Sequence, residues 1–214
     1  MYQNIYIEKP QKGKPIVHIW DDKKGYQKFQ FTPYAYIKSQ TGQHRSLYGD
    51  KLKKVKFWTG EDLQKGDIFE SDVPLETRVL VDMYGDSNEP SEGHKEVFFD
   101  IEVEIKDGFP EWKSAKNKIT SIALYNKMED CNMVFIISDK IQSYTNDNTT
   151  VEVFGTEQQL LQAFLKYWIN TKPTIISGWN INKFDIPYLY NRITKVFGEE
   201  FASALSPIQI VKYN

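Results

Sequence analysis

Short runs of aromatic and β-branched residues, separated by turn-forming residues, characterise the first part of the chain. This pattern predicts β-strands over residues 4–8 and 16–20, and a hairpin-like connection over 21–25 leads from them into a third run over 26–37. Pro33 interrupts the third run. We therefore expect a small, mostly β unit at the front of the chain.

A polar stretch rich in turn formers lies near the middle of the chain. Residues 86–93 read Asp-Ser-Asn-Glu-Pro-Ser-Glu-Gly and contain no apolar side chain. Residues 60–75 are polar and mixed, and predict either a short helix or a loop. We place the domain boundary in 86–93, which gives an N-terminal domain over 1–95 and a second domain over 96–214.

Strand-like and helix-like periods follow one another after this boundary. Strands are predicted over 97–105, 118–125, 133–138, 151–154 and 174–179, with a turn at 107–110. A helix is predicted after Thr156, because Gln159 completes a capping box and the apolar positions that follow have a helical period. A second helix is expected from about Asp185 to Gly198. Strands followed by helix, strand and helix indicate a mixed sheet with flanking helices, in an α/β (α+β) protein.

Charge is divided unevenly along the 214 residues, although the formal total is only −2. Up to Trp58 there are 12 Lys or Arg and 4 Asp or Glu. The rest of the chain therefore has 15 Lys or Arg (27 − 12) and 25 Asp or Glu (29 − 4). A basic front can attract a polyanion, and an acidic back can supply carboxylates for metal ions. Cys131 is the only cysteine, which excludes an intramolecular disulfide and a cysteine-based zinc site.

Hydrophobic residues make up 40% of the chain, which is enough for a sizeable core and excludes a wholly disordered protein. No apolar stretch approaches the roughly 20 residues needed to cross a bilayer. The first residues also lack the charged segment and apolar run of a secretory signal. We expect a soluble, cytoplasmic protein with no membrane partner.

Two carboxylates on the strand over 97–105 are the first candidate for chemistry. Asp100 and Glu102 project from one face of a strand whose other face is apolar, because side chains alternate. A divalent cation such as Mg²⁺ or Mn²⁺ would remove their mutual repulsion. The alternative is an edge strand whose polar face, with Glu104, simply meets solvent.

The second candidate is Asp185, at a predicted strand-to-helix turn, where α/β sheets commonly place ligands. The alternative is that Asp185 only caps the following helix. Two roles are also open for Asn180: its side chain can orient a ligand, or it can stabilise the turn by a hydrogen bond.

Together these segments resemble the first two motifs of the DEDD 3′–5′ exonucleases, Asp-x-Glu followed by Asn-x-x-x-Phe-Asp. Residues 97–111 and 178–193 look like the family B DNA polymerases of tailed bacteriophages, and residues 31–36 resemble the N-terminal domain of the same enzymes. The resemblance implies that 96–214 form an RNase H-like exonuclease domain of a replicative, proofreading DNA polymerase. The implied location is the cytoplasm of an infected host.

The resemblance also implies roles for individual residues. Two metal ions, Mg²⁺ or Mn²⁺, would cleave a terminal nucleotide, with Asp100 bridging both ions. Glu102 would bind the ion that carries the attacking water, and Asp185 the other ion. Asn180 and Phe184 match motif positions and are implied to contact the substrate. The implied partner is DNA, as a primer 3′ end and a single-stranded template.

A third motif of that family, Tyr-x-x-x-Asp, does not occur in these 214 residues. We therefore expect an incomplete exonuclease domain that is weak or inactive alone, either a truncated chain or one product of a split gene that a second polymerase polypeptide completes. An alternative is a non-enzymatic nucleic-acid-binding or scaffold subunit of such a split polymerase. The missing motif and the extra front domain disfavour a free-standing exonuclease.

The basic front segment is densest in cations at residues 51–56. We expect the lysines there to bind nucleic acid through its phosphates, with nearby aromatic rings on the bases. The alternative is a solvated cationic face over aromatic core residues. The candidate lysines are Lys51, Lys53, Lys54 and Lys56.

Overall fold

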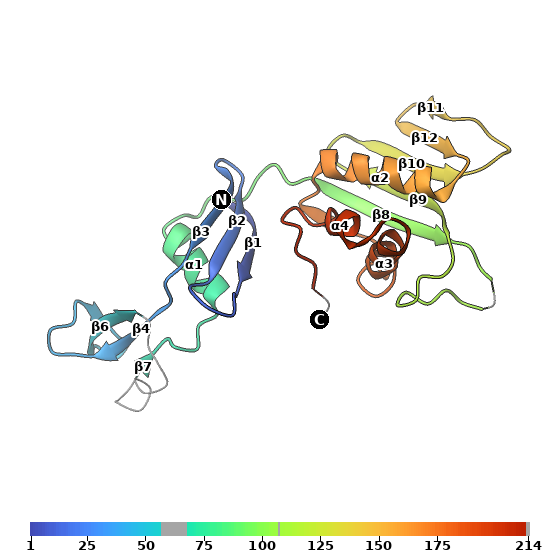
Figure 1. Cartoon of the computed structure of the whole chain (residues 1–214). Coiled ribbons are helices and arrows are strands. Elements are labelled where there is room, and N and C mark those ends of the chain that lie inside the picture. Colours follow the sequence, from blue (N-terminus) through green and yellow to red (C-terminus); the bar gives the residue numbers. More distant parts are fainter. Residues whose placement is uncertain (57–67, 107, 213–214) are drawn as a thin grey trace. The chain divides into compact units, whose positions relative to one another are not determined.

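The computed structural model describes residues 1–56, 68–106 and 108–212. The chain divides into two compact units, unit 1 (Met1–Gly93) and unit 2 (His94–Asn214), whose elements are labelled in Figure 1. Residues 60–67 of the predicted short helix or loop, and Asp107 of the predicted turn, lie outside the described residues. None of the helices within the described ranges is long and apolar enough to cross a membrane.

Unit 1 begins with a three-stranded antiparallel sheet made of β1 (Tyr2–Glu8), β2 (Ile16–Asp21) and β3 (Gly25–Gln30). The predicted hairpin between the last two strands is confirmed. Helix α1 (Leu75–Tyr84) packs its Val79 against Ile7, Val17 and Ile19 of the sheet. This helix was not predicted, because its N-cap position holds Pro74, which has no side-chain group to cap the first turn.

A second sheet of unit 1 has the strand order β5-β6-β4-β7. Its strands are β4 (Tyr34–Lys38), β5 (His44–Arg45), β6 (Lys51–Lys56) and β7 (Ile68–Phe69). Tyr34 joins this sheet to α1, because its hydroxyl donates a hydrogen bond to the Asp82 carboxylate. The Arg78 guanidinium lies 4.3 Å from the centroid of the Tyr34 ring, and Lys54 Nζ lies 3.4 Å from it.

Unit 2 is built on one mixed six-stranded sheet with the order β11-β12-β10-β9-β8-β13. The strands are β8 (Glu96–Val103), β9 (Ile119–Asn126), β10 (Cys131–Ile137), β11 (Tyr144–Asn146), β12 (Thr149–Phe154) and β13 (Ile175–Ser177). β8, β9 and β10 are antiparallel neighbours, whereas β12 runs parallel to β10 and β13 parallel to β8. The predicted mixed sheet is confirmed.

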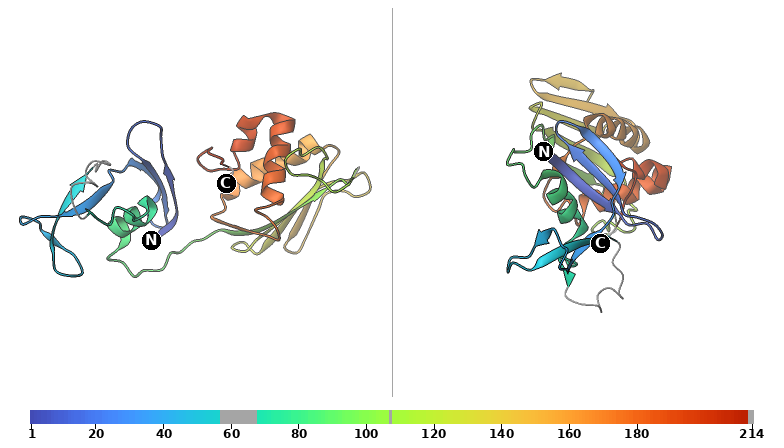
Figure 2. Two further views of the ribbon diagram at one scale, coloured as in Figure 1. Left: turned by 90° about the horizontal axis from the view of Figure 1, so that it is seen from below. Right: turned by 90° about the vertical axis from the view of Figure 1, so that its left-hand side faces the viewer.

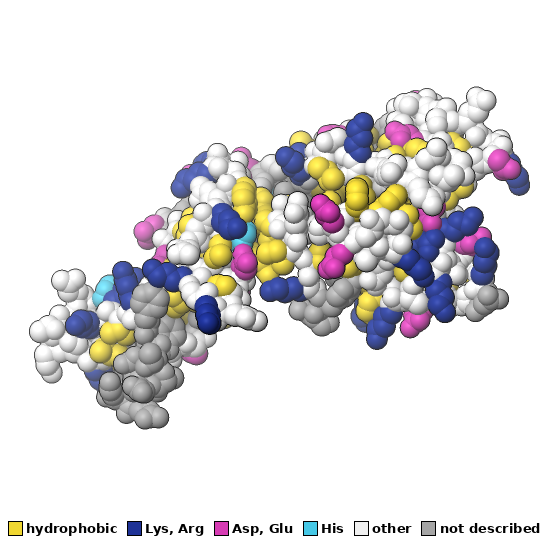
Figure 3. All heavy atoms as spheres, viewed as in Figure 1, with side chains coloured by type: hydrophobic (Ala, Val, Ile, Leu, Met, Phe, Trp, Pro, Cys, Tyr) yellow, Lys and Arg dark blue, Asp and Glu magenta, His cyan; other side chains and the backbone are white. Residues whose placement is uncertain are grey.

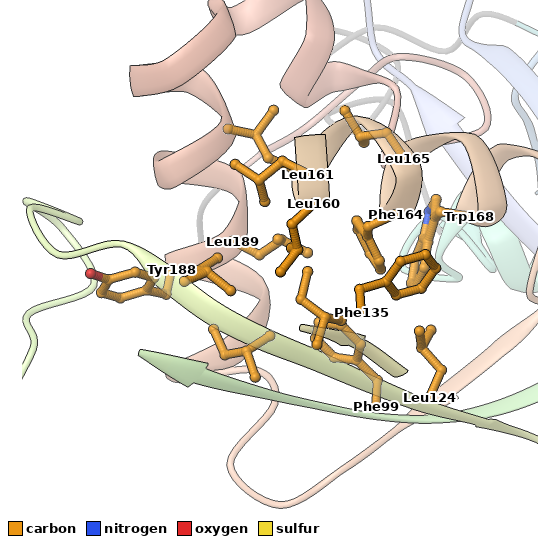
Figure 4. Packing of buried hydrophobic residues seen from close by; sticks show 14 of the residues in the cluster. Phe99, Leu124, Phe135, Leu160, Leu161, Phe164, Leu165, Trp168, Tyr188 and Leu189 are labelled. Carbon is orange, nitrogen blue, oxygen red and sulfur yellow. The ribbon is translucent and has the colours of Figure 1, made fainter. Parts of the chain in front are cut away.

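Helix α2 (Glu157–Thr171) lies between β12 and β13 in the chain, and α3 (Asp185–Phe197) and α4 (Glu199–Ser203) follow β13. Figure 2 shows α2 and α3 on the same face of the sheet. The predicted cap of α2 is present, since the Thr156 hydroxyl accepts a hydrogen bond from the Gln159 N–H at 3.3 Å. The core lies between sheet and helices, as Figure 4 shows for Phe99, Phe135 and Phe164. β8 and α3 are therefore fixed by one shared core.

A buried ion pair ties α2, α3 and the segment before β9 together. The Glu157 carboxylate accepts hydrogen bonds from Arg192 Nε at 2.8 Å and Nη2 at 2.7 Å, and from the Ile119 N–H at 2.8 Å. Arg192 Nη1 donates to the carbonyls of Ala115 and Lys116. Both charged groups of the pair are thus hydrogen-bonded on several sides, as buried charges require.

We predict that Arg192→Met lowers the free energy of unfolding by about 3–5 kcal/mol, because it leaves the Glu157 carboxylate buried without its charge partner. Urea unfolding followed by circular dichroism measures the change. Lys127→Met is the matched control, since it breaks the exposed 2.8 Å pair with Glu96 and should lose about 1 kcal/mol or less. Equal losses in the two variants would contradict the structural role assigned to Glu157 and Arg192.

Candidate functional site

Asp100 and Glu102 lie on β8, where they alternate with buried core residues. Phe99 and Ile101 are 2% and 6% exposed, whereas both acids are exposed. Both carboxylates therefore project from the sheet face opposite the core, as predicted. β9 pairs with one side of β8 from Val97 to Val103, whereas β13 pairs with the other side only at Glu96–Phe98. The edge-strand alternative is therefore excluded for the start of β8 and not for the part that carries Asp100 and Glu102.

The backbone just after β13 passes very close to the backbone of β8. Ser177 of β13 pairs with Phe98, and Gly178 comes next. A Cβ at Gly178 would lie 2.3 Å from the carbonyl oxygen of Phe99, so only glycine fits there. Asn180 then adopts a positive φ of 55°, which asparagine tolerates better than most residues. The turn that follows starts α3 beside β8.

Asp185 is the first residue of α3 and is only 3% exposed. Burial raises the pKa of its carboxyl, and the negative charges of Asp100 and Glu102 raise it further. Hydrogen bonds from the backbone N–H groups of Asp185 and Ile101 act in the opposite direction on this pKa. The pKa of the Asp185 carboxyl therefore responds to the charges of both strand acids. The N-cap position of α3 is Phe184, and no side-chain capping hydrogen bond is present there.

The three acids offer the donor chemistry that Mg²⁺ and Mn²⁺ prefer, because every donor is a carboxylate oxygen. Their mutual repulsion is the kind of interaction that a bound cation relieves. Among the residues that the structure describes, however, no three His, Cys, Asp or Glu side chains lie close enough to enclose a metal ion as they stand. In this structure, therefore, Asp100, Glu102 and Asp185 do not by themselves enclose a metal site.

Phe184 and Asn180, the two implied substrate contacts, flank the start of α3 in different surroundings. The Phe184 ring is half-buried, 5.3 Å from the Tyr188 ring and 5.7 Å from the Phe109 ring. Asn180 is exposed. Phe109 is 84% exposed and thus presents an aromatic ring next to Phe184. Sequence spacing did not single it out, because 75 positions (184 − 109) separate it from its ring partner.

The four candidate lysines of unit 1 lie on β6 but project from both faces of its sheet. The strand register places Lys51 and Lys53 on one face, and Lys54 and Lys56 on the other. Lys54 is engaged with the ring of Tyr34 in a cation–π contact. Figure 3 shows Lys and Arg side chains gathered over this part of unit 1. The structure therefore does not bring the four ammonium groups together on one surface.

Comparison with known proteins gives both a family match and full-length relatives. Residues 86–212 match the family model for DNA polymerase family B, exonuclease domain. The chain is 29% identical, over 96% of its length, to the DNA-directed DNA polymerase of Escherichia phage RB69, and 24% identical, over 98%, to that of Enterobacteria phage T4. It is 33% identical over 87% of its length to a DNA polymerase of Pyrococcus glycovorans. The chain spans 27% or 28% of the length of these relatives.

We predict that Asp185→Asn raises the melting temperature of the metal-free protein at pH 7. A carboxyl with a raised pKa favours the folded state below its ordinary pKa of 3.8, and this contribution is lost as the pH rises through the higher folded-state pKa. The ionised carboxyl therefore destabilises the fold at pH 7, and the asparagine removes that charge. Thermal unfolding in the presence of EDTA measures the effect.

The advantage of Asp185→Asn should shrink on acidification, as the wild-type carboxyl takes up its proton while the pH falls through its raised pKa. Asp139→Asn is the control, because it removes one negative charge from an exposed position of unit 2 and should leave the melting temperature unchanged. An Asp185→Asn protein no more stable than wild type at pH 7, or an advantage that grows on acidification, would contradict this interpretation of the site.

Proposed function

Since the chain belongs to DNA polymerase family B, we propose that residues 96–214 are the first part of a 3′–5′ exonuclease domain of a replicative DNA polymerase. In this proposal the domain removes mispaired nucleotides from a primer 3′ end. We further propose that residues 1–95 form a separate basic domain that binds single-stranded template DNA. The family match to residues 86–212 supports the first of these assignments.

The proposal rests above all on the family match over residues 86–212, within which Asp185 is buried at the start of α3 while Asp100 and Glu102 are exposed on β8. These acids come from two segments of the chain, and 85 positions (185 − 100) separate Asp100 from Asp185. A cluster of like charges is unfavourable for folding, and α3 holds Asp185 within it at a buried position. Such an arrangement is typical of sites whose chemistry needs the charges in place.

Asp100, Glu102 and Asp185 would hold Mg²⁺ or Mn²⁺, two ions in the complete enzyme. When bound, such ions supply an activated water and stabilise the departing 3′ oxygen. Asp185 would provide a fixed ligand, because its carboxyl is held by backbone N–H groups. The two exposed strand acids would adjust to the cations, and Asn180 and Phe184 would position the terminal nucleotide.

We propose that the chain by itself is a weak exonuclease or an inactive one. The motif Tyr-x-x-x-Asp does not occur among these 214 residues, so one carboxylate of the family's set has to come from other sequence. A further polymerase polypeptide is the partner that this proposal requires if the gene is split. The competing function is a non-enzymatic, nucleic-acid-binding scaffold, and it predicts no response of unit 2 to divalent cations.

We expect the purified chain to release nucleotides from a 5′-labelled single strand at or near the background rate, in Mg²⁺ or in Mn²⁺. Metal binding itself should persist. At 100 times its dissociation constant, Mn²⁺ should add about 2.7 kcal/mol to the free energy of unfolding. The Asp100→Asn protein should lose this stabilisation, because one of the three carboxylates that would hold the ion is gone. Product gels and urea unfolding with and without Mn²⁺ make the two measurements.

Asp139→Asn should respond to Mn²⁺ as wild type does, since it lies in the exposed segment after β10. Rapid, metal-dependent release of mononucleotides by the purified chain would refute the proposed weakness of the isolated exonuclease. A wild-type chain that gains no stability in Mn²⁺ would refute the metal site and favour the scaffold function.

A further inference from the structure

The hairpin that joins β5 to β6 carries two apolar side chains at its tip. Leu47 is 100% exposed and Tyr48 is 93% exposed. Isolated exposed apolar residues are common on protein surfaces. Here, however, two neighbours are fully presented to solvent at the end of a hairpin, away from the core that α1 and the first sheet share. We call residues 46–49 the hairpin tip.

Hydrogen bonds hold the backbone of the hairpin tip in one shape. The Ser46 hydroxyl oxygen accepts hydrogen bonds from the N–H of Tyr48 at 3.2 Å and of Asp50 at 3.1 Å. The Ser46 carbonyl accepts one from the Gly49 N–H at 3.0 Å, and Arg45 Nη1 donates to the Gly49 carbonyl at 3.3 Å. The turn is thus satisfied internally, so the side chain of Tyr48 is presented by a fixed backbone.

Cations surround the hairpin tip. Arg45 pairs directly with Lys51 across the two strands, and Lys53 follows two residues later, so the three side chains share one face. The nearby acid is Asp50, whose carboxylate accepts a hydrogen bond from the Ser46 hydroxyl and lies 3.7 Å from Lys38 Nζ. An exposed ring on a hydrogen-bonded turn therefore lies at the end of a row of positive charges.

We propose that the hairpin tip is a base-stacking site for single-stranded nucleic acid, with Tyr48 against a base and Arg45, Lys51 and Lys53 on the adjoining phosphates. Exposed aromatic rings next to cations that follow a backbone are the combination that binds unpaired strands. This inference rests on the proposed nucleic-acid-binding function of residues 1–95. It divides the four candidate lysines, because only Lys51 and Lys53 share the face of Arg45.

Charge argues for a nucleic acid over a second copy of this chain. Two hairpin tips in contact would bring two rows of like cations together, which is unfavourable. A polyanion with apolar bases matches both the row of cations and the ring. Duplex DNA offers the phosphates but keeps its bases stacked inside, so the ring would gain nothing from it.

The test measures binding by fluorescence anisotropy in EDTA, with closed circles of single-stranded oligothymidine that have no 3′ end for unit 2. Tyr48→Ala should weaken binding about 5- to 100-fold, the usual range for removal of one base-stacking ring. Tyr48→Phe should bind as wild type does, since stacking needs the ring and not the hydroxyl. Tyr144→Ala is the matched control, because Tyr144 is 53% exposed on β11 of unit 2.

Circles of abasic residues and duplexes of equal length supply the decisive comparison, because on both of them Tyr48→Ala should equal wild type. The double variant Lys51→Gln/Lys53→Gln should instead lower the slope of log affinity against log salt, by about 0.7 for each phosphate that the protein no longer neutralises. Tyr48→Ala should leave that slope unchanged.

Each outcome decides one of the two ideas. Salt-dependent binding by wild type that Tyr48→Ala does not weaken would overturn the stacking site and leave the nucleic-acid-binding function standing. Wild-type binding that does not depend on salt would overturn that function, and the hairpin tip with it. Self-association in sedimentation that Tyr48→Ala abolishes, without weaker oligonucleotide binding, would show that a second copy occupies the tip and would overturn the stacking site.

Discussion

The close approach of Gly178 to the carbonyl of Phe99 is the constraint on which the candidate site depends. A Cβ at 178 would lie 2.3 Å from that oxygen, so any other side chain would push β13 and the start of α3 away from β8. With glycine at 178, α3 can begin beside β8. The pKa of Asp185, its first residue, is then raised by the charges of Asp100 and Glu102. The repulsion that results is opposed by the core shared by β8 and α3. The fold thus holds like charges together that would otherwise separate.

The two units use charge in opposite ways, and this gives structural meaning to the uneven charge along the sequence. Unit 2 buries one ion pair, Glu157 with Arg192, in which both charged groups are hydrogen-bonded. It leaves its candidate site as an acid cluster whose natural counter-charge is a cation. Unit 1 carries its four candidate lysines on the small sheet that contains β6, and Lys54 and Arg78 lie over the ring of Tyr34. A metal-dependent site and a phosphate-binding surface are the functions that these arrangements favour.

The sequence predicted the elements whose signals are local and missed those that depend on tertiary contacts. Alternation on β8 and the Thr156 cap of α2 were visible because each involves neighbouring residues. The lysine-rich strand β6 was missed, because its stability comes from pairing with β4 and not from its own composition. The sequence identified the three acids as candidates. It could not predict the burial of Asp185, because that burial arises from the packing of segments that are distant in sequence. The contact of the Phe109 ring with Phe184 could not be predicted for the same reason.

The central claim is that Asp100, Glu102 and Asp185 converge on one divalent cation. The most direct measurement is the paramagnetic broadening of backbone amide NMR signals during titration of the full chain with Mn²⁺. The account predicts that the amides of 100–102 and of 184–186 broaden together, at the lowest Mn²⁺ concentrations and before any other segment. Broadening of only one of these segments, or broadening that begins at exposed acids such as Glu199 and Glu200, would contradict it.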